Sequence, residues 1–366
     1  KTGVERTFKS AFINVSVDAK NVADVKFTLM DPKGATIAND TANEKGEVNF
    51  NVNEPLLWSA EIPDLYTLLI EYNGEVICEK IGLREIKIEN TVIKFNGRAI
   101  KLRGVNRHDS YPTTGYVCTE KQMLKDLMLM KANNFNAIRT SHYPNDPRFL
   151  QLCDRYGFYV IDEADLESHG VPMAYGGDYE HFRHLIDDPY WTKAVCDRSI
   201  QLVERDKNRS CVIFWSLGNE SGFGCTLRQA IKEIRAIDNT RPIHYESAYW
   251  KDDFLFDDTG LDMVSRMYPP VELIKNYLAD ERCDKPFILC EYSHTMGNGP
   301  GDIKEYWDLV ESDDRFVGGF LWEWCNHSFP LGKTEDGITK YGYGGDYGDL
   351  VVHLQRIGVQ LLLNFT

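Results

Sequence analysis

The chain has 366 residues, of which 43% are hydrophobic and 27% are charged, a composition typical of soluble globular proteins. Its 41 basic and 56 acidic side chains give a net charge of −15, which argues against nucleic acid and anionic membrane surfaces as partners. The length exceeds what one hydrophobic core usually holds, so we expect two domains, and no apolar run approaches the roughly 20 residues that span a bilayer.

Residues 1–90 contain short, mostly alternating runs of β-branched and aromatic residues with little helical periodicity. The clearest runs are Phe12–Val17, Val25–Leu29, Val48–Val52 and Tyr66–Ile70. Turn sequences such as Asp31-Pro32-Lys33-Gly34 separate them. Several strands at this spacing predict an immunoglobulin-like β-sandwich. We expect its role to be structural, because it contains no catalytic constellation.

Residues 91–349 alternate between predicted strands and predicted helices. The strands are expected to end near Asn106, His142, Asp162, Glu220, Glu246, Tyr268, Glu291 and Trp322, and the helices include residues 120–133, 191–205, 226–238 and 303–311. This alternation predicts a (β/α)8 TIM barrel rather than an open sheet. Most chemically interesting residues fall at the carboxyl ends of the strands, where such barrels build their active sites.

Two glutamates stand at the ends of buried strands. Glu220 lies in Trp215-Ser216-Leu217-Gly218-Asn219-Glu220-Ser221, and Glu291 lies in Ile288-Leu289-Cys290-Glu291-Tyr292-Ser293-His294. Either glutamate alone would most often be a surface acid. Two carboxylates on different strands of one barrel are the usual equipment for cleaving a glycosidic bond, in which one protonates the leaving oxygen and the other attacks the anomeric carbon or activates water.

These two motifs resemble the catalytic motifs of glycoside hydrolase family 2, in particular the large bacterial and yeast β-galactosidases. The resemblance implies that Glu291 is the nucleophile, that Glu220 is the acid/base, and that Asn219 binds the 2-hydroxyl of the sugar. It also implies retaining hydrolysis of terminal, lactose-like β-galactosides, with the two carboxylates separated by about 5–5.5 Å. Glu291 must be ionised and needs hydrogen-bond donors, whereas Glu220 must start protonated.

A candidate metal site follows the third predicted strand. Glu167 and His169 point the same way if their segment is extended, so both could reach one cation. In isolation, a Glu-x-His sequence would most often belong to a solvent-exposed loop that binds no metal. In the family resembled here, the matching residues bind Mg²⁺ together with the acid/base, which is Glu220 in this chain. Magnesium commonly takes few protein ligands and several waters.

Three histidines follow other strands, namely His108, His142 and His294. Three imidazoles could hold zinc, but a His-Glu-x-x-His helix is missing from the sequence, and any of the three could be an ordinary core histidine. The resemblance implies that the three histidines hydrogen-bond sugar hydroxyls and the transition state. It also implies that Tyr268 hydrogen-bonds the nucleophile beside the substrate and that Trp322 offers an apolar face to the sugar ring. Core packing is the alternative for Trp322. We expect Arg103, Arg139 and Asp162 to hold the catalytic and binding side chains in place without contacting the substrate.

The resemblance covers about residues 5–349. The tail at residues 350–366 departs from the family, which suggests a truncation or an altered reading frame and a barrel incomplete at its C-terminal end. The segment that supplies the family's sodium ligands is not recognisable, so no Na⁺ site is expected. An inactive catalytic-core fragment, acting at most in sugar binding or assembly, is therefore the alternative to an active enzyme.

Nine cysteines are scattered without CxxC pairs or zinc spacing, which is typical of reduced thiols in a cytoplasmic protein. The formal glycosylation sequon at Asn219 points the same way, because a glycan there would block the proposed site. The expected partner is a β-galactoside. The resemblance implies a homo-oligomer for the full-length protein but leaves the state of this chain open.

Overall fold

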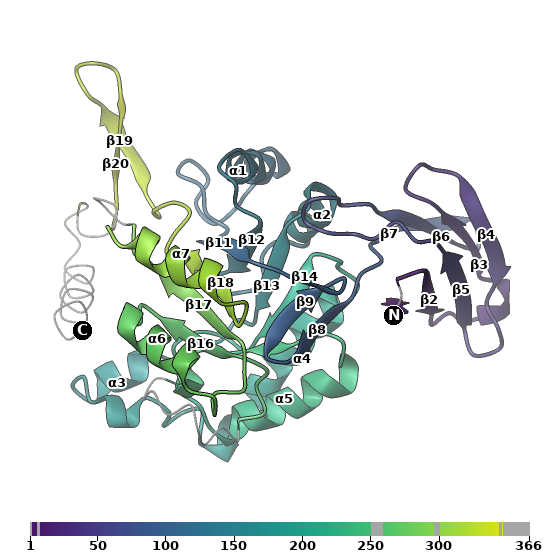
Figure 1. Cartoon of the computed structure of the whole chain (residues 1–366). Coiled ribbons are helices and arrows are strands. Elements are labelled where there is room, and N and C mark those ends of the chain that lie inside the picture. The colour runs from purple at the N-terminus through teal and green to yellow at the C-terminus, as the bar shows by residue number, and fades with distance from the viewer. Residues whose placement is uncertain (1, 6–7, 250–258, 296–300, 344–345, 347–366) are drawn as a thin grey trace.

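The computed structural model describes residues 2–5, 8–249, 259–295, 301–343 and 346, and it shows a β-sandwich joined to a barrel of parallel strands (Figure 1). The atypical tail at residues 350–366 and residues 296–298 of the nucleophile motif lie outside this part of the chain. Within the described residues, none of the helices combines the length and apolarity that crossing a bilayer requires.

The predicted sandwich is confirmed. One sheet has the order β1-β2-β5 and the other the order β4-β3-β6-β7. The strands are β1 (Thr2–Val4), β2 (Ser10–Ser16), β3 (Lys26–Met30), β4 (Thr36–Thr41), β5 (Glu47–Asn53), β6 (Tyr66–Tyr72) and β7 (Glu75–Ile81). In β5 the buried residues Val48, Phe50 and Val52 alternate with exposed ones, as expected for a strand with one face on a core.

The predicted barrel is also confirmed, and it is slightly unsealed. All strand pairs in the eight-stranded sheet are parallel, in the order β15-β14-β13-β12-β11-β18-β17-β16, so no pairing joins β15 to β16 in the described residues. The strands are β11 (Leu102–Arg107), β12 (Ala137–Thr140), β13 (Tyr159–Glu163), β14 (Val212–Ser216), β15 (Ile243–His244), β16 (Val264–Met267), β17 (Phe287–Tyr292) and β18 (Phe316–Leu321). The gap lies beside β15, the shortest of these strands.

Helices cover the outside of the barrel (Figure 1). They are α1 (Glu120–Ala132), α2 (Pro147–Tyr156), α4 (Thr192–Asp206), α5 (Cys225–Ile237), α6 (Val271–Ala279) and α7 (Ile303–Ser312), with the short α3 (Gly170–Ala174) in the loop after β13. The four helices predicted from sequence are all present. A capping box between Thr119 and Gln122 begins α1, which satisfies backbone donors that the helix cannot pair internally.

Two small antiparallel sheets flank the barrel strands in sequence. β8 (Ile86–Glu89), β9 (Val92–Phe95) and β10 (Arg98–Ala99) precede β11, and their buried residues Ile86, Ile93 and Phe95 belong to the barrel core. β19 (Phe329–Lys333) and β20 (Thr339–Gly342) form a hairpin after β18 that projects from the body (Figure 1). The described residues after β18 contain this hairpin and no α-helix.

Buried polar contacts join the sandwich to the barrel. The indole of Trp58 is fully buried and donates to the backbone oxygen of Asp154 at 2.8 Å. Arg209 pairs with both Glu79 of the sandwich (2.7 Å) and Asp154 of the barrel (3.2 Å). On the barrel, these contacts lie near the C-terminus of α2 and just before β14, and not at the carboxyl ends of the strands that carry the candidate site.

Candidate active site

The two predicted catalytic glutamates lie at the carboxyl ends of β14 and β17. Glu291 is the second-last residue of β17, and its Oε1 accepts a hydrogen bond from Nη1 of Arg139 at 2.8 Å. Its Oε2 accepts one from the Tyr268 hydroxyl at 2.9 Å. Glu220 follows β14, and its neighbour Asn219 accepts a bond from Nη2 of the same Arg139 at 2.9 Å. One guanidinium therefore links the two glutamate motifs.

Arg139 is fully buried at the centre of the barrel mouth. Besides Glu291 and Asn219, it donates to both oxygens of Glu163 (2.7 and 3.0 Å) and to the side-chain oxygen of Asn106 (3.1 Å). Burial lowers the pKa of Arg139, but the Glu163 and Glu291 carboxylates outweigh it, and the net pKa is raised well above its ordinary value. This permanent cation holds the acceptors around it in place.

The Glu291 residue is 5% exposed, and burial raises the pKa of its carboxyl. Arg139, and after it His142, lower the pKa because a positive charge nearby favours the carboxylate, while the nearby Glu220 raises it further. Arg139 and Tyr268 are the donors that an ionised nucleophile needs. Tyr268 reaches Glu291 from a left-handed backbone conformation with φ of 46°.

A tight backbone arrangement presents Glu220. Gly218 has φ of 136°, and a Cβ there would meet the backbone oxygen of Leu166 at 2.5 Å, so glycine is required. Asn219 then donates its backbone N–H to Leu166, and a β-bridge pairs Asn219 with Glu167. The backbone N–H of Glu220 donates to Oε1 of Glu246 at 2.8 Å. The loops after β13, β14 and β15 thus fix this glutamate together.

Glu220 is held in its basic form in this arrangement. Burial raises the pKa of its carboxyl, but the hydrogen bond between its Oε2 and Nδ1 of His169, 2.5 Å long, outweighs burial, and the net pKa is lowered. The sequence-based expectation was a carboxyl that starts protonated. His169 is the physical reason for the difference, because a charged imidazole stabilises the carboxylate.

Glu167, His169 and Glu220 form a cluster whose ligand atoms all lie within 4.8 Å of one another. Nε2 of His169 contacts the Tyr179 hydroxyl at 2.8 Å, which turns Nδ1 toward Glu220. Two carboxylates and one imidazole, with Glu167 exposed, leave room for water around a bound ion. This donor set fits Mg²⁺, which retains several waters.

The predicted sugar-binding side chains form two groups of ring contacts, and each group has a member beside Glu291. His142 stacks on Trp322 with ring centroids 5.1 Å apart, and its Nδ1 contacts Glu163 at 2.8 Å. His108 meets the edges of both His142 and Trp322, at 5.5 and 5.6 Å. His294 lies 6.2 Å from the ring of Tyr268. Among the described residues, none of the clusters that could hold a metal combines His108, His142 and His294.

Two residues expected to order the site do not contact the candidate glutamates. Arg103 is on the outside, where its guanidinium pairs with the exposed Glu311 at 3.5 Å. The Asp162 carboxylate accepts from Thr140 at 3.2 Å, and burial together with the neighbouring Asp206 of α4 raises its pKa, so it faces the helices. Adjacent residues of a strand point to opposite faces, which explains why Glu163, not Asp162, reaches Arg139.

Sequence reasoning missed three buried carboxyl groups of the site: Glu163, Glu246 and Glu323. Strand alternation could have identified Glu163, because Asp162 and Glu163 cannot face the same side. Glu246 was recognised only as a strand end, although burial raises its pKa to about 8 and it accepts from Glu220 and Ser247. No simple pattern in the sequence distinguishes Glu323 from the aromatic residues beside it.

We expect Glu163 to contribute strongly to the acid sensitivity of the barrel. Burial raises its pKa, but Arg139 and His142 outweigh burial and bring the pKa from 4.5 to about 2. A depressed folded pKa contributes stability that is present above pH 4.5 and is lost as pH falls toward 2. Glu163→Gln should lower the free energy of unfolding at pH 7 by about 3–5 kcal/mol, because Arg139 loses its buried partner. It should also flatten the fall in stability between these two pH values.

Urea denaturation at several pH values would measure both effects. Glu311→Gln is the matched control, since it removes an exposed acid from an exposed arginine. If the free energy of unfolding of Glu163→Gln fell as steeply between pH 4.5 and 2 as that of the unmodified chain, the proposed role of the Glu163–Arg139 pair would be contradicted.

Comparisons with known proteins agree with this geometry. A model of glycosyl hydrolases family 2 matches residues 1–84, and the TIM barrel domain of the same family matches residues 86–362. A β-galactosidase of Staphylococcus xylosus is 47% identical over 353 residues, which are 95% of this chain and 35% of that protein. A β-galactosidase of Actinobacillus pleuropneumoniae is 43% identical over 348 residues, which are 89% of this chain and 34% of that protein. The chain thus spans about a third of the length of these curated relatives.

The fold also resembles solved structures. A β-glucuronidase of Ruminococcus gnavus superimposes with a TM-score of 0.75 at 21% identity, covering 92% of this chain and 63% of that one. Its complex with uronic isofagomine gives a TM-score of 0.74 at 22% identity, covering 88% and 61%. At this identity the likeness shows the fold alone. The two family matches cover the sandwich and the barrel in turn, and the chain belongs to glycoside hydrolase family 2.

Proposed function

We propose that this chain carries the catalytic site of a retaining β-galactosidase. The observation that carries the proposal is the bridge from Arg139 to both Glu291 and Asn219 at the mouth of a parallel barrel. It sets two glutamates, each preceded by a buried strand, in one site. The names and identities of the curated relatives support galactosides as the substrate class.

In the first step, the Glu291 carboxylate attacks the anomeric carbon while the bond to the leaving oxygen breaks. Glu220 transfers its proton to that oxygen, which leaves as an alcohol. Glu291 loses its negative charge as the covalent bond forms. Arg139 and Tyr268 hold its two oxygens at 2.8 and 2.9 Å, which orients the attacking carboxylate and stabilises it again when it leaves.

In the second step, Glu220 acts as a base. It removes a proton from water, the water oxygen bonds to the anomeric carbon, and the bond to Glu291 breaks. The lowered pKa of Glu220 suits this half of the cycle. Two inversions give net retention, for which the carboxylates should be about 5–5.5 Å apart.

The surrounding side chains would bind the sugar. Asn219 would contact the 2-hydroxyl, and the three histidines His108, His142 and His294 would contact other hydroxyls or the transition state. Trp322, already stacked on His142, would present an apolar face to the ring.

Glu167, His169 and Glu220 would hold Mg²⁺. The ion would supply positive charge that lowers the proton affinity of Glu220 and ties it to the loop after β13. No Na⁺ site is proposed for this chain, because the residues expected to carry one are not recognisable in its sequence.

The protein's setting is also a proposal. Nine free cysteines support a reducing, cytoplasmic location, and the negative charge argues against nucleic acid and membrane partners. A homo-oligomer is proposed for the full-length protein only. Because the matched region is about a third of the curated relatives, an inactive catalytic core that at most binds sugar is the second candidate function.

Hydrolysis of an aryl β-galactoside by the purified chain, with Mg²⁺ present, tests the proposal. We expect turnover that Glu291→Gln abolishes, because an amide is a far weaker nucleophile. Glu272→Gln on the exposed face of α6 is the matched control and should retain activity. No turnover by a folded chain that still binds galactose would favour the inactive core. Preference for an aryl β-glucuronide would contradict the substrate class.

Glu220→Gln should slow substrates with poor leaving groups by at least about 100-fold, since these need the proton. Activated aryl galactosides should be less affected in the first step, and azide should restore turnover by replacing the water that Glu220 activates. Rates measured for a series of leaving groups, with and without azide, provide the check. Equal losses across the series without rescue would count against the acid/base role.

Mg²⁺ should stabilise the chain through Glu167. At a concentration 100 times its dissociation constant, a ligand that binds only the folded state adds about 2.7 kcal/mol. We therefore expect Mg²⁺ to raise the melting temperature, chelator to reverse the effect and Glu167→Gln to abolish it. Asp165→Asn is the control, because Asp165 is exposed and pairs with Arg198 at 3.6 Å. An equal rise in Glu167→Gln would remove this residue as a ligand.

A further inference from the structure

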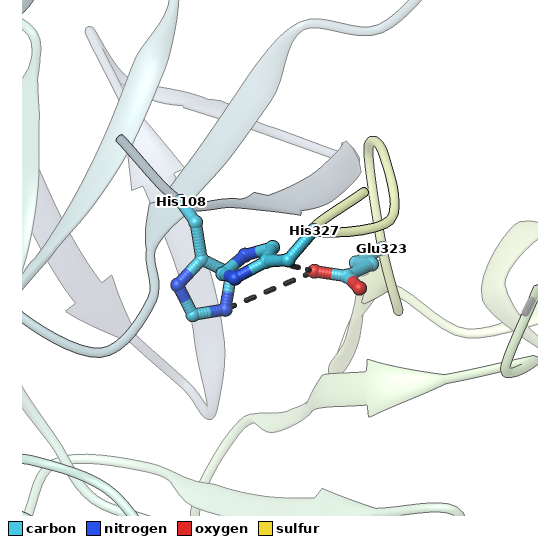
Figure 2. A group of neighbouring side chains, drawn as sticks. All are labelled: His108, Glu323 and His327. Carbon is cyan, nitrogen blue, oxygen red and sulfur yellow. Dashed lines mark ion pairs between the residues drawn. The ribbon is translucent and has the colours of Figure 1, made fainter. Parts of the chain in front are cut away.

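We infer a second metal site at His108, Glu323 and His327, suited to a dication such as Zn²⁺ that prefers imidazole ligands. It is separate from the Glu167, His169 and Glu220 cluster. His108 follows β11, whereas Glu323 and His327 follow β18, and these two strands are paired in the barrel. Figure 2 shows the three side chains turned toward one another from these two segments.

The donor atoms converge. Nε2 of His108 lies 3.8 Å from Oε2 of Glu323, and Nε2 of His327 lies 3.9 Å from the same oxygen. The three ligand atoms all lie within 4.8 Å of one another. Zinc bonds of about 2.0–2.2 Å in a tetrahedron put neighbouring ligand atoms roughly 3.4 Å apart. The two imidazole–carboxylate distances of 3.8 and 3.9 Å exceed this spacing by about half an ångström, so small side-chain shifts would bring both imidazoles and the carboxylate to zinc-binding distance.

These polar groups are poorly satisfied without a ligand. The Glu323 side chain is 6% exposed, and its Oε2 lies 3.8 and 3.9 Å from Nε2 of His108 and Nε2 of His327, which is too far for a hydrogen bond to either ring. Within the part of the chain that the structure describes, the buried Nε2 of His327 lacks a hydrogen-bond partner. A buried carboxylate and a buried ring nitrogen are costly when unpaired, and a shared cation would satisfy both.

The histidines are in the form that binds metals. Burial lowers the pKa of His108 to about 2, aided by the neighbouring His327 and His142, and burial also lowers the pKa of His327. Both rings are therefore neutral at physiological pH. The Tyr116 hydroxyl lies 3.4 Å from Nδ1 of His327, and a proton donated from that nitrogen leaves the lone pair on Nε2.

The types of ligand atom in the two clusters indicate which ion each cluster prefers. Two imidazoles and one carboxylate, with a fourth position open to water, form a common zinc ligand set. The first cluster offers one imidazole and two carboxylates, which suits a harder ion. The two clusters should thus divide Zn²⁺ and Mg²⁺ between them.

Occupancy would also affect the sugar site, a consequence that rests on the proposed function. His108 packs against Trp322 and His142, and a metal on its Nε2 would remove that nitrogen from substrate hydroxyls. Zn²⁺ bound here should act as an inhibitor that competes with galactoside.

Direct metal binding tests the site without relying on activity. The parent for the test is His169→Asn, which disables the first cluster. Calorimetric titration of this protein with ZnCl₂ in excess Mg²⁺ should show one site, and Co²⁺ should give the intense visible absorption of a four-coordinate ion. Adding His327→Gln or Glu323→Gln should weaken the affinity for Zn²⁺ by more than about 100-fold, because changing a residue that merely contacts a metal ligand already costs about 10–100-fold.

His181→Gln is the matched control, because His181 is partly exposed and outside both clusters. It should leave the titration unchanged. Absence of zinc binding by folded His169→Asn would overturn the inference, and so would equal affinity in the His327→Gln and Glu323→Gln proteins. Circular dichroism of each protein establishes that it is folded, and neither result depends on whether the chain hydrolyses galactosides.

Discussion

The buried guanidinium of Arg139 is the constraint on which the site depends. A cation without solvent must have its charge and its donors satisfied, and Arg139 obtains this from Glu163, Glu291, Asn106 and Asn219. These partners belong to β11, β13 and β17 and to the loop after β14, so one side chain requires four segments of the barrel mouth to meet. The catalytic geometry is in this sense also a condition of the fold.

The two glutamates receive different environments from this arrangement. Glu291 is enclosed, so burial raises its pKa while Arg139 opposes the rise. Glu220 is tied to His169, which more than offsets burial and lowers its pKa. An enzyme that uses Glu220 first as an acid must weaken the contact with His169 before the first step. A cation that occupies His169 and Glu220 together, as proposed, would change that contact directly.

The fold and the position of both candidate glutamates at strand ends were predictable because a buried strand followed by Gly- and Ser-containing loops is a local pattern. Pairings between distant segments were not. The sequence suggested Arg103 and Asp162 as ordering residues, but Arg103 faces solvent and Asp162 faces α4, and the partner of Arg139 is Glu163. Likewise, His108 meets Glu323 only because β11 and β18, the first and last barrel strands, are neighbours. Such contacts follow from closure of the barrel, which local sequence does not encode.

The central claim is that Arg139 and Tyr268 prepare Glu291 as the nucleophile, and covalent trapping tests it most directly. A 2-deoxy-2-fluoro-galactoside with a good leaving group forms the glycosyl-enzyme quickly and releases it slowly, so the labelled peptide can be located by mass spectrometry. The account predicts a single galactosyl label on Glu291. A label on another carboxylate, such as Glu220 or Glu323, would contradict it, and so would turnover of the galactoside without any covalent label.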